Sequence, residues 1–335
     1  MSVFIIAEAG VNHNGDIGLA KELVAIAAES GADAVKFQTF KADRLAASSA
    51  AMAEYQVENV GEEKSQREML KALELAEDRY QELIEECSQR GIEFMSTPFD
   101  EESAEFLVSL GMKRIKMASG ELTNLPFLRH VARNRLPLVI STGMANLGEV
   151  ELAVETIESE WADPALTILQ CVSNYPASPK SINLRAMQTL ASFGYPVGYS
   201  DHTNGIGVAI ASVALGASVI EKHFTLSRSM VGPDHKASLE PDELKAMVRE
   251  IRDVELALGG ARKRPNPEEI STASVARKSL VIRHNLPSGH VLSEADLVAK
   301  RPGTGIPTRM MDFFVGRTLK RSVLADELLS LEFFE

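Results

Sequence analysis

Two histidines stand at matching positions in the chain, because each one follows a predicted strand. His202 follows the apolar run that ends at Tyr199, and His223 follows the strand that begins at Val219. An Ala- and Gly-rich stretch of helical periodicity, residues 205–214, separates the two strands. If the strands are parallel neighbours, both imidazoles lie at the carboxyl edge of one sheet. There they can bind a divalent metal and leave coordination positions open for water or substrate.

Two lysines follow other predicted strands and predict a site for an anion. They are Lys36 and Lys116, and hydroxyl residues at further strand ends accompany them: Thr97, Ser119 and Ser141. Lysine supplies a mobile positive charge, while hydroxyls and loop amides supply hydrogen-bond donors. Each lysine could instead extend its ammonium group to water at a strand end.

Three carboxylates complete the set of chemically active residues. Glu8, Glu121 and Asp234 are candidates for general acid–base work or for positioning, although each could equally cap a helix. Lysines, a metal and carboxylates together suit a reaction in which a phosphate and a carboxylate are held while a carbonyl is polarised.

The elements that must position these residues alternate between strand and helix. Eight strand-then-helix units in a row predict a (β/α)8 TIM barrel over residues 1–259, in which the residues above share one face. A doubly wound open sheet is the alternative, but the chain has no GxGxxG phosphate loop. We expect residues 41–65 to form a long loop with a short helix, a possible lid, and residues 68–90 to form one helix.

The rest of the chain predicts a second, smaller unit. Residues 260–273 are polar and contain proline, which is typical of a linker, and residues 274–335 are enough for a small loop-rich domain. The formal net charge of −12 over 335 residues argues against nucleic acid or an anionic membrane surface as a partner. Two cysteines give no disulfide framework, and the first residues do not resemble a signal peptide. We therefore expect a cytoplasmic protein.

Eight motifs carry a resemblance to a known family. They are residues 7–15 (AEAGVNHNG), 35–39 (VKFQT), 96–99 (STPF), 116–121 (KMASGE), 141–144 (STGM), 199–203 (YSDHT), 221–225 (EKHFT) and 232–236 (GPDHK). In this order they resemble the sialic acid synthase family, whose members make nine-carbon nonulosonic acids. The tail, with Arg301-Pro302-Gly303, looks like the family's C-terminal antifreeze-like (SAF, β-clip) domain.

The resemblance implies a reaction in which phosphoenolpyruvate condenses with an open-chain N-acylated mannosamine-type sugar and releases phosphate. It implies Mn²⁺, or Mg²⁺ or Co²⁺ in its place, on His202 and His223. The residues that it assigns to phosphoenolpyruvate are Lys36, Lys116, Ser119 and Ser141. It implies that Glu8 handles the water or proton at the pyruvyl C2. The residues that it assigns to the sugar pocket are Gln38, Thr97, Phe99, Tyr175 and Asp234, with Glu121 beside the site.

The resemblance also implies a domain-swapped homodimer, in which the SAF domain covers the partner's barrel and Arg301 reaches the sugar's N-acyl group. Two departures leave details open. The motif after strand six has Ser173 and then Asn174 where some members place a single Asn, so either residue is a candidate for the phosphate contact. Phe37 and Phe40 replace histidines of some members, and a less polar wall suits a deoxy, diacetamido sugar. Both N-acetylmannosamine and the legionaminic acid precursor therefore remain candidate acceptors.

Two other functions compete with this one. A Schiff-base aldolase would use Lys36 or Lys116 as a nucleophile on pyruvate, but it would have no use for paired histidines. A sugar-binding protein without catalysis would leave the charged residues at the strand ends idle.

Overall fold

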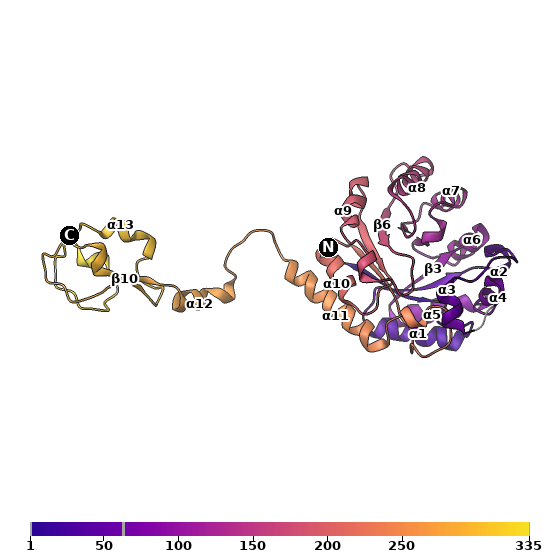
Figure 1. The fold of residues 1–335 in the computed structure, drawn as a ribbon, viewed down its shortest axis with the longest axis horizontal. Coiled ribbons are helices and arrows are strands. Elements are labelled where there is room, and N and C mark those ends of the chain that lie inside the picture. Colours follow the sequence, from indigo (N-terminus) through magenta and orange to yellow (C-terminus); the bar gives the residue numbers. More distant parts are fainter. Residues whose placement is uncertain (1, 62–63, 335) are drawn as a thin grey trace. The chain divides into compact units, whose positions relative to one another are not determined.

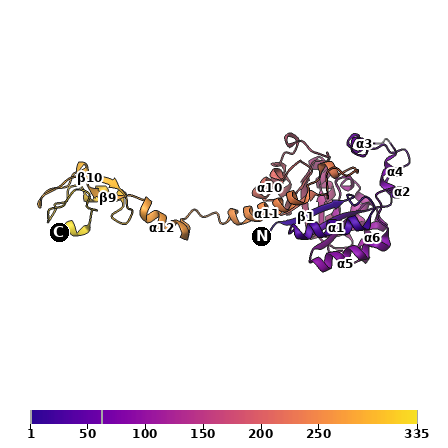
Figure 2. The ribbon, with the colours of Figure 1, turned by 90° about the horizontal axis from the view of Figure 1, so that it is seen from below.

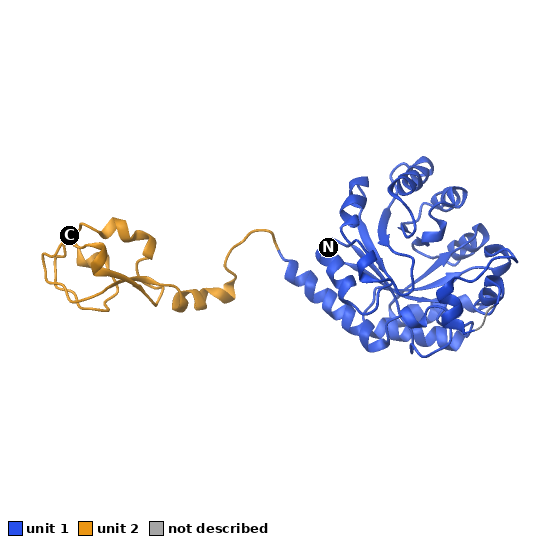
Figure 3. Ribbon diagram, viewed as in Figure 1, with its two compact units in different colours: residues 1–259 blue, residues 260–335 orange. Residues whose placement is uncertain are grey.

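The computed structural model describes residues 2–61 and 64–334, and the chain divides into two compact units, Met1–Gly259 and Gly260–Glu335 (Figure 3). Part of the predicted linker is helical, because α12 runs over Pro267–Ala276. Pro267 occupies the first turn of this helix, and Asn266 and Glu269 form a capping box. Both are favourable N-terminal signals, which explains why a polar, proline-containing stretch is a helix here.

The first unit is the predicted barrel. Its eight parallel strands are β1 (Phe4–Gly10), β2 (Ala34–Thr39), β3 (Glu93–Pro98), β4 (Ile115–Met117), β5 (Leu138–Ser141), β6 (Leu166–Cys171), β7 (Val197–Asp201) and β8 (Val219–His223). They form one sheet in the order β3-β2-β1-β8-β7-β6-β5-β4. The two end strands, β3 and β4, contact each other without a hydrogen-bonded ladder, so the barrel is nearly closed. The prediction of a TIM-like barrel is confirmed.

Helices follow the strands around the outside of the barrel (Figures 1 and 2). They are α1 (Ile17–Glu29), α2 (Ala42–Leu45), α3 (Glu54–Val60), α4 (Gln66–Lys71), α5 (Tyr80–Arg90), α6 (Glu101–Ser109), α7 (Leu125–Ala132), α8 (Leu147–Glu160), α9 (Ala186–Leu190), α10 (Gly207–Ala214) and α11 (Pro241–Leu258). The predicted single helix over residues 68–90 is wrong, because it breaks between α4 and α5. Met69 and Leu73 pack in one apolar cluster, whereas Tyr80 and Leu83 pack in the main core, so one straight helix cannot serve both.

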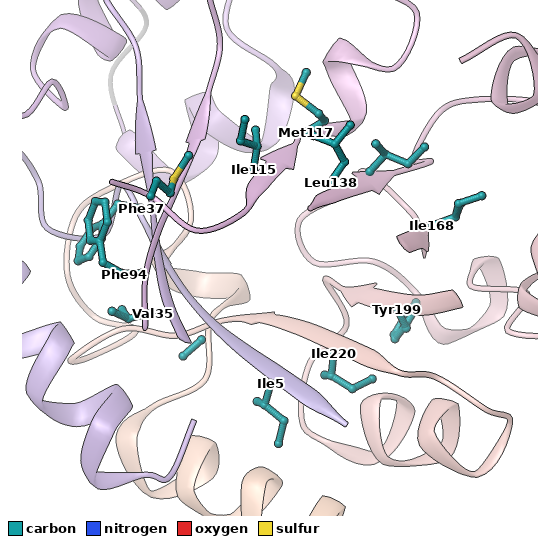
Figure 4. Close-up of a cluster of buried hydrophobic side chains, with 14 of the residues drawn as sticks. Ile5, Val35, Phe37, Phe94, Ile115, Met117, Leu138, Ile168, Tyr199 and Ile220 are labelled. Atoms are coloured by element: carbon teal, nitrogen blue, oxygen red, sulfur yellow. The ribbon is translucent and has the colours of Figure 1, made fainter. Parts of the chain in front are cut away.

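The alternation of side chains along each strand separates the core from the site. Outward-facing residues such as Ile5, Ile115 and Ile220 pack against the helices in the main hydrophobic core (Figure 4). Inward-facing residues, including Ile6 and Met95, fill the lower part of the barrel. Toward the carboxyl ends of most strands the inward-facing residues become polar or charged, as at Glu8, Thr97 and Ser141.

Residues 42–61 and 64–73, with α2, α3 and α4, form what we call the lid segment. An apolar cluster holds it on the barrel, formed by Val11, Phe40, Met52, Met69 and Leu73. Helix α3 has no fully buried residue, but Asn59 donates a hydrogen bond to the carbonyl of Pro233 at 2.6 Å. The predicted loop with one short helix thus contains two helices, α2 and α3.

The second unit has its own small core. Two antiparallel strands, β9 (Ser279–Ile282) and β10 (Leu297–Lys300), pack with the short helix α13 (Met311–Phe314) around Leu280, Ile282 and Phe314. Across residues 2–61 and 64–334, no helix is both long and apolar enough to cross a membrane.

Candidate active site

A cavity of about 450 Å³ opens at the carboxyl ends of the barrel strands. It collects thirteen of the predicted site residues, from all eight strand ends: Glu8, Lys36, Gln38, Thr97, Phe99, Lys116, Ser119, Ser141, Ser173, Tyr175, His202, His223 and Asp234. Parallel strands bring their carboxyl ends to one face of the barrel, and this explains why residues far apart in sequence meet here.

Four charged side chains form the floor of this cavity. The Lys36 ammonium lies 2.6 Å from the Glu8 carboxylate and 3.6 Å from that of Glu221, and it donates to Thr97 Oγ1 at 2.9 Å. The Lys116 ammonium lies 3.5 Å from Glu221 on the other side and donates to the carbonyl of Met117. Glu221 therefore sits between the two lysines and holds them at the bottom of the barrel mouth.

The pKa values of these four groups are shifted by burial and by their contacts with one another. Burial raises the pKa of Glu8 to about 7, and Lys36 only partly opposes this. Burial acts the same way on Glu221, but Lys116 and Lys36 outweigh it and lower its pKa to about 2. Burial would lower the pKa of Lys36, yet Glu221 and Glu8 outweigh that effect and raise it. Burial lowers the pKa of Lys116. The floor therefore offers two buried lysine side chains to an anion in a chain that is acidic overall.

Hydroxyl groups line the wall next to Lys116. Ser119 Oγ accepts a hydrogen bond from the backbone amide of Gly143 at 3.0 Å, and both Ser119 Oγ and Ser173 Oγ lie close to the position that a Cβ atom of this glycine would occupy. Ser141 Oγ is buried and has no hydrogen-bond partner among the described residues. An unpartnered buried donor beside two lysines fits a phosphate or carboxylate oxygen. We call Ser119, Ser141, Ser173 and Gly143 the hydroxyl cradle.

Replacement of Gly143 tests the cradle. A Cβ atom at this position would come within 2.2 Å of Ser173 Oγ and 2.7 Å of Ser119 Oγ, so Gly143→Ala must displace both hydroxyls. We expect the KM for the anionic substrate to rise about ten- to a hundredfold, the usual effect of losing a hydrogen bond to a charged group. Gly207→Ala, where a Cβ meets no atom within 4 Å, is the matched control. An unchanged KM in a folded Gly143→Ala protein would contradict the role of the cradle.

The two histidines lie side by side, with ring centroids 5.4 Å apart. His202 Nδ1 contacts the carbonyl of Val172 at 2.7 Å, so it carries the proton and leaves Nε2 free to bind a ligand. Burial, with His202 nearby, lowers the pKa of His223 well below its usual value, and its Nδ1 has no partner among the described residues. Burial would lower the pKa of His202 as well, but Cys171 and the carbonyl of Val172 outweigh that effect and raise it. A metal would bind the neutral form of both imidazoles. Within the described part of the chain no third His, Cys, Asp or Glu completes a metal cluster, so water or substrate would supply the other ligands.

The side of the cavity near the histidines has the mixed character of a sugar pocket. The Tyr175 ring lies 4.0 Å from that of His202, and Tyr55 of the lid segment stacks on Tyr175 at 5.2 Å. Burial raises the pKa of Asp234 to about 6. Gln38 donates a long hydrogen bond, 3.4 Å, to Glu8. Aromatic faces with a few polar groups are what a sugar requires.

Three predicted residues do not line this cavity. Glu121 accepts a hydrogen bond from Asn124 Nδ2 and belongs to the turn before α7. Asn174 is exposed, whereas its neighbour Ser173 lines the cavity. Arg301 belongs to the second unit, where its Nε donates to the carbonyl of Ala276.

The sequence reasoning missed Glu221 and misplaced two aromatic rings, because neither Phe37 nor Phe40 lines the cavity. Glu221 stands two residues before His223 on β8, and residues two apart on a strand face the same side, so the signal was present. Phe37 does not form part of the cavity wall, because it alternates with Lys36 and stacks on Phe94 in the main core. Tyr55 had no strand-end signal, since only the folded lid segment brings it to the cavity.

Comparison with known proteins agrees with this geometry. A family model described as the NeuB family matches residues 23–263, and a SAF domain model matches residues 277–335. The chain is 52% identical to the N,N'-diacetyllegionaminic acid synthase of Legionella pneumophila, over 100% of this chain and 95% of that protein. It is 47% identical to the N,N'-diacetyllegionaminic acid synthase of Campylobacter jejuni, over 97% of this chain and 98% of that protein.

A solved structure gives the same answer. The N-acetylneuraminic acid (sialic acid) synthetase of Leptospira borgpetersenii, crystallised with citrate, superposes with a TM-score of 0.71 at 35% identity, covering 81% of this chain and 90% of that chain. The resemblance seen in the eight motifs is thus confirmed over the barrel and the C-terminal domain alike. The chain belongs to the NeuB family and ends in a SAF domain.

Proposed function

We propose that the chain condenses phosphoenolpyruvate with 2,4-diacetamido-2,4,6-trideoxymannose to give N,N'-diacetyllegionaminate and inorganic phosphate. The chain is a nonulosonic acid synthase, and its two relatives at 52% and 47% identity are both N,N'-diacetyllegionaminic acid synthases over nearly their full length. The observation that supports the proposal most strongly is the meeting of two buried lysines, the hydroxyl cradle and the paired histidines in one cavity.

The two substrates would occupy different parts of this cavity. Lys36, Lys116 and the hydroxyl cradle supply positive charge and donors for the phosphate and carboxylate of phosphoenolpyruvate. Gln38, Thr97, Phe99, Tyr175 and Asp234 would line the space left for the open-chain sugar. This arrangement brings C3 of phosphoenolpyruvate to the aldehyde carbon, which converts a bimolecular reaction into an oriented one.

The chemical steps follow from these positions. C3 attacks the aldehyde carbon, the aldehyde oxygen takes up a proton, and positive charge develops at C2. Glu8, whose pKa is raised to about 7, would take a proton from the water that adds to C2. In the resulting tetrahedral phosphate hemiketal, the C2–O bond to the phosphate breaks and the C2 hydroxyl gives up its proton. Phosphate leaves, and the 2-keto group forms. The nearby lysines stabilise the departing phosphate.

His202 and His223 would hold a divalent ion, for which Mn²⁺ is our proposal, with Mg²⁺ and Co²⁺ as substitutes. Such an ion, when bound, polarises the sugar aldehyde as a Lewis acid. Glu8 lies opposite His223 in the register of β1 and β8, and the nearby Glu221 opposes the effect of burial on the pKa of both imidazoles.

A panel of acceptors tests the reaction directly. Purified protein with a divalent ion and phosphoenolpyruvate is given N-acetylmannosamine, its 6-phosphate or 2,4-diacetamido-2,4,6-trideoxymannose, and released phosphate is measured. We expect the highest kcat/KM with the diacetamido sugar. In the same assay, ¹⁸O at the bridging oxygen of phosphoenolpyruvate should appear in the phosphate. Absence of phosphate release with every acceptor would reject the proposed function.

Lys116 gives the Schiff-base aldolase its one supporting observation, because burial lowers its pKa and a neutral amine is the nucleophile in such enzymes. Its ammonium nevertheless lies beside Glu221 and donates to Met117, as a charged phosphate ligand would. Borohydride added with pyruvate should therefore leave the protein unmodified by mass spectrometry.

We further propose a domain-swapped homodimer in which Arg301 reaches the sugar bound in the partner's barrel. Arg301→Ala should then lower kcat/KM for the sugar about ten- to a hundredfold while the KM for phosphoenolpyruvate stays the same. Arg309→Ala, at another exposed arginine of the second unit, is the control. When impaired Arg301→Ala and inactive His202→Ala proteins are mixed and allowed to exchange subunits, the mixture should show a higher kcat/KM for the sugar than either variant alone. Equal losses for both substrates, or no recovery despite subunit exchange, would refute this arrangement.

A further inference from the structure

One side of the cavity mouth is apolar, in contrast to the charged floor. Three residues of the lid segment, Met69, Leu70 and Leu73, line the cavity together with Phe99, which follows β3. We call these four residues the apolar patch. None of the four side chains carries an oxygen or nitrogen atom. Since these four side chains offer neither charge nor a hydroxyl group, the patch requires a ligand group of a different kind from the one that the charged floor requires.

The patch is firmly supported from behind. Met69 and Leu73 are almost fully buried and belong to the apolar cluster that holds the lid segment on the barrel. Phe40 of the same cluster packs edge-on against Phe99, with ring centroids 6.0 Å apart. A side chain held in this way cannot easily turn aside to let a bound polar group reach water. The patch therefore favours an apolar ligand group over a polar one.

A polar residue borders the patch on the same helix. Gln66 lines the cavity one turn before Met69 and Leu70 on α4, so the three residues share one face of that helix. An amide side chain both donates and accepts hydrogen bonds. The lid segment thus offers a group that can bind an amide directly beside a surface that can bind a methyl group.

We propose that the apolar patch is the specificity subsite for the C6 methyl group of a 6-deoxy acceptor, with the neighbouring C4 acetamide directed toward Gln66. This proposal rests on the proposed function, because it assigns one end of the same acceptor. A C6 hydroxyl placed against the patch would lose its hydrogen bonds to water without replacement, whereas a methyl group loses none. A hydrophobic pocket discriminates against an added hydroxyl by up to about a hundredfold.

Two sugars that differ only at C6 provide the test. They are 2,4-diacetamido-2,4,6-trideoxymannose and 2,4-diacetamido-2,4-dideoxymannose, assayed for kcat/KM with saturating phosphoenolpyruvate. We expect the full-length protein to prefer the 6-deoxy sugar about ten- to a hundredfold. Leu70→Asn, which places a hydrogen-bonding group of similar size in the patch, should reduce this preference at least about tenfold by improving use of the 6-hydroxy sugar. The KM for phosphoenolpyruvate should not change.

The matched control is Leu45→Asn. Leu45 of α2 packs against the same apolar cluster but does not line the cavity, so this variant loosens the lid segment equally without changing the patch. It should leave the ratio between the two sugars as it is in the parent protein. Equal kcat/KM for the two sugars in the parent protein, or the same change of ratio in both variants, would overturn the subsite. Failure of all acceptors to release phosphate would instead reject the proposed function itself, so the two failures are distinguishable.

Discussion

Glu8→Gln is expected to slow turnover by about a hundred- to ten-thousandfold while both substrates still bind. The amide keeps the size of the side chain but cannot accept a proton from the water that adds to C2. Glu8 is almost fully buried, lies 2.6 Å from Lys36, and has a pKa raised to about 7. Single-turnover measurements with saturating substrates would show the loss in the chemical step.

The pH dependence gives a second readout of the same group. Glu8 must be a carboxylate to accept the proton, and the carboxylate form increases as the pH rises through about 7. In the parent protein kcat/KM for phosphoenolpyruvate should therefore rise over this range, because this parameter reports ionisations of the free enzyme and free substrate. Glu8→Gln should lose this rise. Glu160→Gln, at an exposed ion pair with Arg133, is the control. A Glu8→Gln protein with a parental rate and pH profile would show that another group accepts the proton.

Removal of the divalent ion is expected to abolish turnover, and Mn²⁺, Co²⁺ or Mg²⁺ should restore it. Two neutral nitrogens and several oxygen ligands make a permissive site, so no single ion is required. Exhaustive dialysis against EDTA, followed by elemental analysis and titration with each ion, measures both the loss and the recovery.

His223→Ala removes one of the two proposed ligands and should give a protein that neither binds the ion tightly nor turns over. His130→Ala is the matched control, because His130 lies on α7 beside Glu105 and does not line the cavity. It should retain metal binding and activity. Full activity in protein shown to be free of metal would contradict the metal site.

Much of the active site could be predicted because a parallel barrel places the end of every strand on one face. The sequence shows where Lys36, Lys116, His202 and His223 follow apolar runs, and a count of eight such runs is enough to predict that these residues meet. The same rule failed for Glu121 and Asn174. Each lies next to a residue that lines the cavity, and only the local turn decides which of two neighbours faces inward.

The lid segment shows why other features required the tertiary structure. The residues from Met69 to Leu83 have one continuous helical pattern, yet their apolar positions pack in two separate clusters, and the chain bends between them. Tyr55 and Leu70 line the cavity only because the folded lid segment brings α3 and α4 to it.

The sequence by itself determined the barrel, the SAF domain, the reaction class and most of the strand-end residues, because these depend on local periodicity and on motifs. The tertiary structure alone decided two other features: the contact of Glu221 with both lysines, and the apolar patch of the lid segment. Each of these depends on contacts between residues far apart in the chain, and no pattern within a single segment specifies such contacts.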